Sequence, residues 1–333
     1  MASPFDAVLL IAFGGPMGRA DIRPFLANVL RGRRVSPERV EEVAHHYELF
    51  DGVSPITRLT LRQAEGLRDG LAASGHPLPV YVGMRNWNPY LRDTLAQMSR
   101  DGMRRAVGVI AAAHRSYSSC TQYKENVADA RRALREAGLA DVQVTYVSDW
   151  HLSPGFIEAN ADHVAATVQT LPPDVCRDAE LVFTAHSIPV SMAQKYPYQS
   201  QLEASCLAVA QEIARRTSPP RLPKWRLVFQ SRSGRPEDPW LEPDVCDYLR
   251  EAPGDGASGV VLCPIGFVCD HIEVLYDLDT EAADVAATLG LPLARASAVN
   301  DHPRFVDALA GAVVDTVRSY ARGRALPIAP AAA

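Results

Sequence analysis

The chain has 333 residues, of which 47% are hydrophobic and 22% charged, a composition typical of a globular protein with room for two domains. Its 34 basic and 39 acidic residues give a formal net charge of -5, so no electrostatic feature favours nucleic acid as a partner. The apolar run near the N-terminus lacks a basic leader, and no apolar stretch approaches the roughly 18 residues needed to cross a bilayer. We therefore expect a cytoplasmic protein without a transmembrane segment, and a monomer as its default state.

Short apolar runs alternate with longer amphipathic segments along the chain. The expected strands lie at residues 8–13, 80–83, 106–112, 142–147, 181–185, 225–230 and 260–264, and the clearest helices at 57–73 and 199–216. Nearly continuous apolar strands separated by helices are typical of a parallel sheet covered on both faces. The pattern predicts a doubly wound α/β fold.

The chain also contains two similar halves. In each half, three apolar strands run into polar loops: LLIAFGGP, VYVGMRNWNP and VGVIAAAHRS in the first, and LVFTAHSIP, RLVFQSRSG and VVLCPIGF in the second. We expect two Rossmann-like lobes at residues 1–150 and 151–302, a helix at about 303–321 that packs on the first lobe, and a disordered tail at 326–333. Because open parallel sheets bind ligands beyond the carboxyl ends of their strands, the active site is expected in a cleft between the lobes.

An acidic stripe follows the last of these strands. Asp270, Glu273, Asp277, Glu281 and Asp284 recur at spacings of three and four, so one helix face should carry five carboxylates with no Lys or Arg between them. Like charges at this spacing each cost about 0.2–0.5 kcal/mol, which calls for a compensating cation. The stripe is either a capping box at Asp270 and Glu273 with a solvated acidic face, or a path for a hydrated divalent cation.

A histidine and two loops are further candidates. His186 lies where a buried strand gives way to its loop, so it is either a structural side chain or a base or metal ligand at the binding edge. Arg31, with Arg33 and Arg34, forms a solvated turn or a receptor for ligand carboxylates. Tyr117 and Ser118 begin a helix or line a polar aromatic loop.

Eight segments in order along the chain resemble the ferrochelatase family: LLIAFGGP, VLRGRR, HYELFDGVSPI, VYVGMRNWNPYL, HRSYSSCTQY, LVFTAHSIP, LVFQSRSGRPEDPWLEPD and PIGFVCDHIEVLYDLD. The resemblance implies a type II chelatase that inserts ferrous iron into a porphyrin, with release of two protons, in heme biosynthesis. It also implies that His186 is the catalytic histidine and Glu273 the catalytic glutamate, and that Asp277 and Glu281 continue the path of the metal.

The resemblance further implies a set of porphyrin contacts. Phe13, Arg31, Ser54, Tyr117 and Ser118 match positions that meet the macrocycle or its propionates in relatives. Apolar walls are expected from Leu30 and Ile56.

Departures from other family members refine the prediction. No cysteine follows Cys269, and Ala159 stands where some relatives carry an earlier cluster ligand, so we predict no iron-sulfur cluster and no permanently bound cofactor. The phrases FGGP, FDGVSPI, AHSIP and RNWNP, together with Phe13, are most similar to the actinobacterial-type enzymes, which metalate coproporphyrin III. The next enzyme of the heme pathway is then a possible transient partner.

Three alternatives remain open at this point. The first is a ferrochelatase acting on protoporphyrin IX. The second is a cobalt or nickel chelatase, although such enzymes commonly offer additional histidine ligands. The third is a non-catalytic two-lobed tetrapyrrole-binding protein, which would not need an acidic stripe near a histidine.

Overall fold

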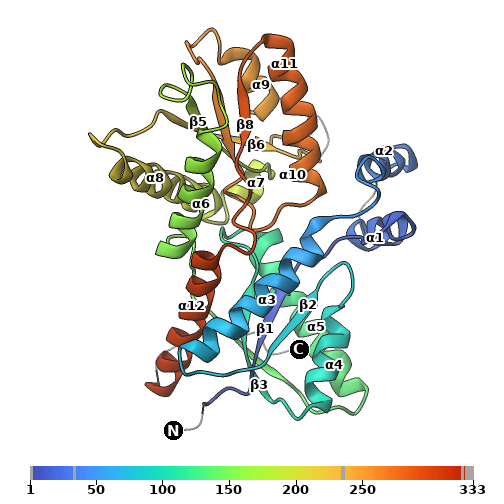
Figure 1. Ribbon diagram of the computed structural model, residues 1–333. Coiled ribbons are helices and arrows are strands. Elements are labelled where there is room, and N and C mark those ends of the chain that lie inside the picture. Colours follow the sequence, from blue (N-terminus) through green and yellow to red (C-terminus); the bar gives the residue numbers. More distant parts are fainter. Residues whose placement is uncertain (1–2, 33–34, 234–236, 324–325, 327–333) are drawn as a thin grey trace. The chain divides into compact units, whose positions relative to one another are not determined.

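The computed structural model describes residues 3–32, 35–233, 237–323 and 326 (Figure 1). The chain forms two compact units, which we call the first and second lobes. The first lobe comprises Met1–Ala111, Ser118–Asp149 and Val306–Ala333, and the second comprises Ala112–Tyr117 and Trp150–Phe305. Residues 327–333 of the expected tail lie outside the described residues.

The largest departure of this division from the expected boundaries is at one crossing segment. Residues Ala112–Tyr117 lie inside the expected first lobe but group with the second. Two hydrogen bonds to the second lobe explain this: His114 Nε2 lies 3.0 Å from Ser205 Oγ, and the Arg115 amide donates to Gln201 Oε1 at 2.8 Å.

The first lobe is built on a parallel sheet with the strand order β2-β1-β3-β4. Its strands are β1 (Ala7–Ala12), β2 (Val80–Met84), β3 (Arg105–Ile110) and β4 (Gln143–Tyr146). Every residue of β1 is buried, as expected for a central strand covered on both faces.

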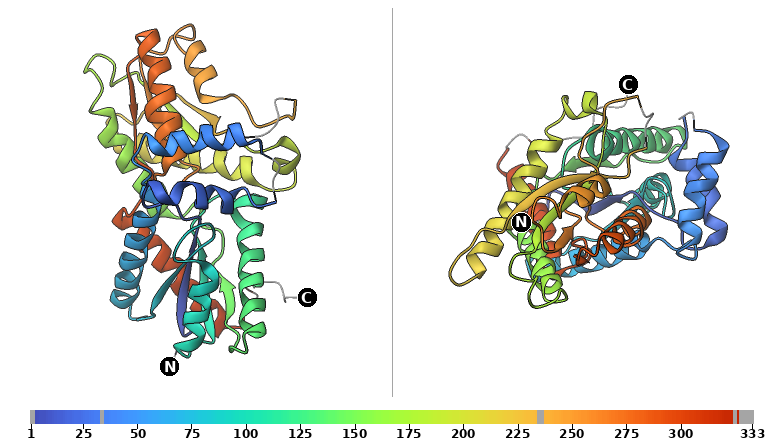
Figure 2. Two further views of the ribbon diagram at one scale, coloured as in Figure 1. Left: turned by 90° about the vertical axis from the view of Figure 1, so that its right-hand side faces the viewer. Right: turned by 90° about the horizontal axis from the view of Figure 1, so that it is seen from above.

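Helices cover both faces of this sheet (Figures 1 and 2). They are α3 (Pro55–Ala73), α4 (Leu91–Arg100), α5 (Gln122–Glu136) and, from its second turn on, α12 (Pro303–Ala321). The connections between the strands also carry η1 (Arg19–Asp21), α1 (Ile22–Val29), α2 (Pro37–Glu48) and the π-helix η2 (Tyr117–Thr121), and α1 and α2 project to one side of the sheet (Figure 1). Glycines allow α3 and α12 to approach closely, because a Cβ atom on Gly66 would lie 2.8 Å from Val306 and one on Gly70 would lie 3.2 Å from Ala310.

The second lobe repeats this topology, with the strand order β6-β5-β7-β8. Its strands are β5 (Glu180–His186), β6 (Trp225–Gln230), β7 (Val260–Cys263) and β8 (Leu293–Arg295), and all pair in parallel. Its helices are α6 (Pro154–Val168), α7 (Val190–Ala193), α8 (Tyr198–Arg216), α9 (Val245–Glu251), α10 (Ile272–Tyr276), the π-helix η3 (Asp277–Ala282) and α11 (Ala283–Leu289). The predicted α/β architecture of two parallel sheets flanked by helices is confirmed. Strand β8 was not predicted.

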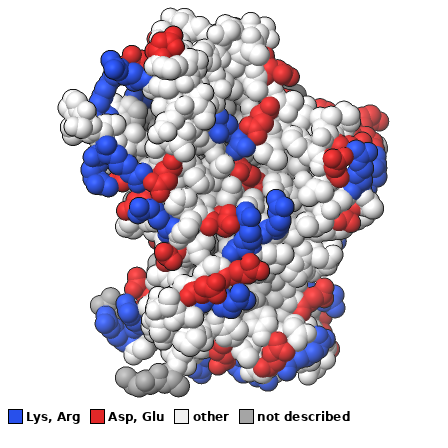
Figure 3. All heavy atoms as spheres, viewed as in Figure 1, with Lys and Arg blue, Asp and Glu red and all other residues white. Residues whose placement is uncertain are grey.

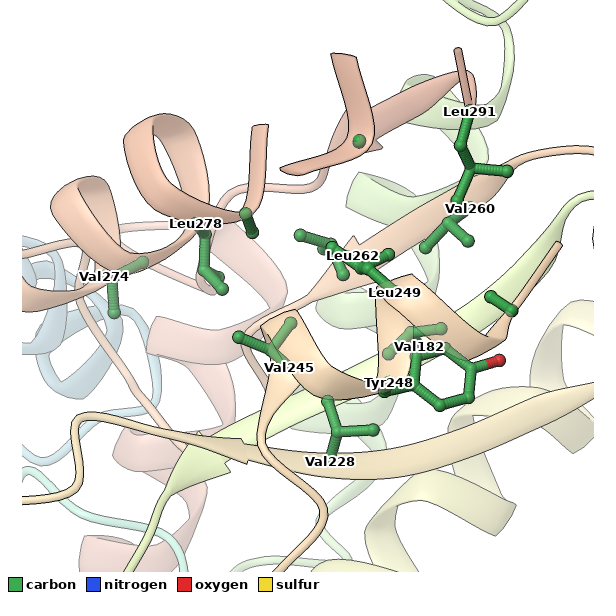
Figure 4. Close-up of a cluster of buried hydrophobic side chains, with 13 residues drawn as sticks. Val182, Val228, Val245, Tyr248, Leu249, Val260, Leu262, Val274, Leu278 and Leu291 are labelled. Atoms are coloured by element: carbon green, nitrogen blue, oxygen red, sulfur yellow. The ribbon is translucent and has the colours of Figure 1, made fainter. Parts of the chain in front are cut away.

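A buried cluster joins one face of the second sheet to its helices (Figure 4). Val182 and Leu262 project from the strands, Leu249 from α9, and Val274 and Leu278 from α10 and η3. The apolar face of the acidic segment is thus packed against the sheet, which leaves its other face for the carboxylates.

Surface charge is mixed. On the face drawn in Figure 3, basic and acidic side chains are interspersed. In the first lobe, Arg23 of α1 pairs with Glu41 and Glu48 of α2 at 2.5 and 3.4 Å. No helix in the described part of the chain is both long and apolar enough to cross a membrane.

Candidate active site

His186 is the last residue of β5, the strand at the second position of its sheet. The six residues of β5 before it are buried, whereas 34% of the histidine side chain is exposed. Its Nδ1 atom hydrogen-bonds the carbonyl oxygen of Ser187, and Tyr198 donates to the carbonyl of His186 itself at 3.0 Å. Because a carbonyl oxygen only accepts, the neutral ring carries its proton on Nδ1 and leaves the Nε2 lone pair available.

Glu273 faces that lone pair. Its Oε2 atom lies 3.9 Å from His186 Nε2, beyond a direct hydrogen bond but within the range of an ion pair. The carboxylate is about half exposed and belongs to the first turn of α10, a position that favours negative charge. The two residues matched to the family's catalytic pair are therefore adjacent in the second lobe.

The capping box that the sequence offered for Asp270 and Glu273 is wrong. The N-cap of α10 is His271, whose Nδ1 accepts from the Val274 amide at 3.3 Å. Burial lowers the pKa of His271, which keeps the ring neutral and able to accept this bond. Asp270 is instead drawn away from the helix, to Arg295 and Asn300.

Asp277 lies one turn beyond Glu273, at the start of the π-helix η3. Its Oδ2 atom accepts hydrogen bonds from Ser231 Oγ and, at 3.2 Å, from Gln230 Nε2. Burial raises the pKa of Asp277 to about 7, and the charges of Glu273 and Glu281 raise it as well, while the two hydrogen bonds oppose the rise. Asp277 can therefore gain or lose a proton near neutral pH.

The helix of the acidic stripe is not uniform. It runs as α10, then as the wider π-helix η3, then as α11, and such π-turns occur often at functional sites. Glu273 and Glu281 are exposed, while Asp277 between them is partly buried. In the described part of the chain, no three His, Cys, Asp or Glu side chains are grouped so as to hold a metal ion. His186, Glu273, Asp277 and Glu281 thus follow one another along the lobe and do not form a single coordination site.

In the first lobe, the candidate residues around Phe13 are brought together by a turn. Phe13 directly follows β1, and the next turn packs so tightly that a Cβ atom on Gly15 would lie 2.7 Å from both Ile56 and Ser54. Thr57 Oγ1 accepts from the Gly15 amide at 3.0 Å and donates to the Gly15 carbonyl at 2.9 Å. Ser54 as a whole is 2% exposed, so it packs against this turn and is not open to solvent.

The remaining candidates lie on α1 and η2. Leu30 is the C-cap of α1, and the exposed Arg31 donates to Asn28 Oδ1 at 2.6 Å. Arg33 and Arg34 lie outside the described residues. Tyr117 and Ser118 are half-buried in η2, and the division between lobes falls between them.

The sequence interpretation missed four residues that this structure places beside the candidates. Arg85, directly after β2, holds its guanidinium 6.0 Å from the ring centre of Phe13 and 5.7 Å from that of Tyr123. Gln230 and Ser231 bind Asp277, and Arg295 binds Asp270. Gln230 and Arg85 could have been found from the sequence, since Gln230 ends an expected strand and Arg85 lies in the loop two residues after another.

Known proteins resemble this chain along nearly its whole length. A profile of the Ferrochelatase family matches residues 5–317. A coproporphyrin III ferrochelatase of Streptomyces griseus is 46% identical over 332 residues, which cover 97% of this chain and 88% of that protein. A ferrochelatase of Rhodopirellula baltica is 45% identical over 313 residues, covering 93% and 86%.

Solved structures share the fold at much lower sequence identity. SirB from Bacillus subtilis with Fe3+ superimposes with a TM-score of 0.55 at 12% identity, over 95% of this chain and 97% of that one. At that identity the likeness concerns the fold alone. The sequence matches carry the assignment and confirm the resemblance seen in the motifs: this chain belongs to the ferrochelatase family.

Proposed function

We propose that this protein is a coproporphyrin III ferrochelatase, which inserts ferrous iron into the macrocycle with release of two protons in heme biosynthesis. The observation that carries the proposal is the pair of His186 and Glu273, 3.9 Å apart at the carboxyl end of a parallel sheet. It is supported by identities of 42–46% to several proteins named coproporphyrin III ferrochelatase.

Metalation requires that two pyrrole N–H protons leave and that the ferrous ion sheds water. In the proposed mechanism, the lone pair of His186 Nε2 takes the two pyrrole protons one after the other and passes each on before the next transfer, and the nearby Glu273 carboxylate stabilises the imidazolium that forms each time. The Ser187 carbonyl, which accepts from Nδ1, holds the ring in the required tautomer. Both residues are partly exposed, so the proton can pass on to water.

The ferrous ion is a substrate in this scheme, and the carboxylates deliver it. Glu281, Asp277 and Glu273 recur every four residues along η3 and α10 and offer hard oxygen ligands that suit a hydrated divalent cation. The path would begin at the exposed Glu281 and end at Glu273, beside His186. Asp277 lies between them. Because burial raises its pKa to about 7, the charge of this carboxyl group changes with pH near neutrality, and passage of iron past it should be the part of the path most sensitive to pH.

The porphyrin contacts are proposed for the first lobe and η2. Phe13, Leu30 and Ile56 would present apolar surface to the macrocycle, and Arg31 would pair with a propionate. Hydroxyl groups of Tyr117 and Ser118 would meet other propionates. Ser54 would act by shaping the turn at Gly15, because it is buried there.

The decisive experiment is anaerobic incubation of the purified protein with ferrous iron and either coproporphyrin III or protoporphyrin IX, followed through the porphyrin Soret band. We expect faster metalation of coproporphyrin III. A faster rate with protoporphyrin IX would reassign the substrate, and no metalation of either porphyrin would refute the proposed activity.

The assignment of the catalytic pair has its own test. His186→Ala and Glu273→Gln should each abolish turnover while porphyrin still binds, as measured by fluorescence quenching. His45→Ala is a matched control, because His45 and Glu48 form an exposed pair with the same 3.9 Å separation on α2. Near-normal rates in both variants of the pair would show that the proton chemistry occurs elsewhere.

A further inference from the structure

Arg295 of β8 binds carboxylates on both sides of the segment that carries Glu273 and Asp277. Its Nη1 atom donates to Asp270 Oδ1 at 2.9 Å, ahead of α10. Its Nε and Nη2 atoms form a two-pronged pair with the carboxylate of Asp279, at 2.5 and 2.8 Å, within η3. One guanidinium thus ties down two points nine residues apart in the chain.

The pair with Asp270 is shielded from solvent, so it should be strong and costly to break. The side chains of Arg295 and Asp270 are 14% and 12% exposed. Asp270 also accepts from Asn300 Nδ2 at 2.8 Å, and its own amide donates to Asn300 Oδ1 at 2.8 Å. Removing one partner of such a pair leaves the other charge uncompensated. That charge destabilises the fold because water hydrates it poorly at a shielded position.

Arg295 itself is held by the sheet. It pairs in register with Leu262 of β7, and the next amide, that of Ala296, donates to the Leu262 carbonyl at 2.8 Å. The guanidinium is therefore a fixed point of the sheet to which the loop before α10 and the π-helix are both attached.

The pair between Arg295 and Asp279 stabilises the π-turn η3. A π-turn is rare and occurs mostly as a local bulge in an α-helix, so a surrounding contact must favour it. Asp279 lies inside η3, and the planar fork of Arg295 accepts its carboxylate in only a narrow range of orientations. The pair therefore favours the π-register over an α-helical register, in which Asp279 would point in a different direction.

We propose that Arg295 is a positioning residue for the iron-delivering carboxylates: by binding Asp270 and Asp279 together, it holds α10 and η3 in the register that aligns Glu273 with Asp277. This inference rests on the proposed ferrochelatase activity. Arg295 also supplies a cation to Asp270, the first carboxylate of the acidic stripe, from a strand 25 residues later in the chain.

The test uses Asp279→Asn, because Asp279 is 39% exposed and its loss should leave the lobe folded. The expected result is a KM for ferrous iron raised about tenfold with the KM for coproporphyrin III unchanged, because the carboxylates lose the contact that holds their register; loss of the outer contacts that orient metal ligands typically costs about 10-fold or more. Amide hydrogen exchange should quicken in residues 273–282. Asp279→Glu should restore both values, and Arg295→Lys, which keeps the charge but not the fork, should fall in between.

Asp178→Asn is the matched control, since it removes an exposed carboxylate from the pair with Arg221, 3.0 Å away in the same lobe. It should leave both KM values and the exchange of 273–282 unchanged. If the wild-type protein metalates coproporphyrin III but Asp279→Asn keeps the wild-type iron KM, the positioning role is refuted and the proposed activity stands. If the wild-type protein metalates neither porphyrin, the activity fails, and unchanged exchange in Asp279→Asn would refute the attachment as well.

Discussion

The hydrogen bond from Ser231 to Asp277 offers a sharp test of how iron reaches the macrocycle. Ser231→Ala removes one of the two donors that stabilise the Asp277 carboxylate, and the Gln230 amide remains. A hydrogen bond to a charged group contributes about 1.5–3 kcal/mol, which corresponds to about one to two pKa units. The pKa of Asp277, about 7 in the wild-type protein, should therefore rise to about 8 or higher.

The assay is the pH dependence of kcat/KM for ferrous iron, measured anaerobically from pH 6 to 9 with saturating coproporphyrin III. If the ionised Asp277 guides the cation, the wild-type rate falls as the pH drops through about 7. In Ser231→Ala this acid limb should move up by at least one pH unit. Ser74→Ala, which removes a hydroxyl that donates to the Gly70 carbonyl on α3, should leave it in place.

Two results would refute this account of the acid limb. One is a limb in Ser231→Ala that stays where it is or moves to lower pH. The other is the same limb in Asp277→Asn, because a group that cannot ionise cannot produce it. Either result would assign the limb to another group.

The pH dependence of folding stability should have the opposite sign to that of the rate: ionisation of Asp277 should raise kcat/KM for iron but lower the free energy of unfolding. Folding raises the pKa of Asp277 from 3.8 to about 7, so ionisation costs stability as the pH rises between these values. A shift of about three units corresponds to at most about 4 kcal/mol. The free energy of unfolding of Asp277→Asn, measured with urea and compared with that of the wild type, should therefore increase steadily from pH 4 to pH 7. Above pH 7 the difference between the two proteins should stay constant. A gain that is independent of pH would contradict the shift.

Three further predictions concern two residues of the first lobe and the predicted lack of an iron-sulfur cluster. Gly15→Ala should lower the free energy of unfolding by about 1–3 kcal/mol, because the added Cβ atom would overlap Ile56 and Ser54. Gly18→Ala is the control and should leave that free energy unchanged, because the space around Gly18 is open. Equal urea midpoints for the two variants would refute this prediction. Arg31→Ala should raise the KM for coproporphyrin III about tenfold through loss of one charge-assisted pair, and an unchanged KM would remove Arg31 from the site. The protein as isolated should show neither visible charge-transfer bands nor acid-labile sulfide, and either signal would reveal a cluster.

Much of the fold followed from apolar runs, because a strand buried on both faces leaves little choice of residue. The expected strand at 225–230 matches β6 at both ends, and the helices expected at 57–73 and 199–216 match α3 and α8 to within two residues at either end. Strand β8 escaped because its three residues are all half-buried and have no apolar run beyond them. Short edge strands gain their order from the neighbouring strand, which the local sequence does not record.

The candidate site was harder to predict, since its local chemistry depends on partners far away in the chain. Spacing alone placed five carboxylates on one helix face, yet Asp270 turns to Arg295 and Asp277 turns to Ser231. The cation that pairs with Asp270 is absent from the helix and comes from Arg295 of β8. The π-turn was equally invisible, because three- and four-residue spacings suit an α-helix and a π-bulge alike.

The π-helices η2 and η3 occupy equivalent places in the repeated fold. Each lies in the connection that leads from the third strand of its half to the fourth: η2 follows β3, and η3 follows β7. The same connection carries Tyr117 and Ser118 in one half and Glu273 and Asp277 in the other. On the proposed roles, the connection that contains η2 presents hydroxyl groups to the porphyrin, and the connection that contains η3 presents carboxylates to the ferrous ion. The repeat therefore provides two similarly bulged segments, and on the proposed roles the side chains placed on them adapt one segment to porphyrin binding and the other to iron delivery.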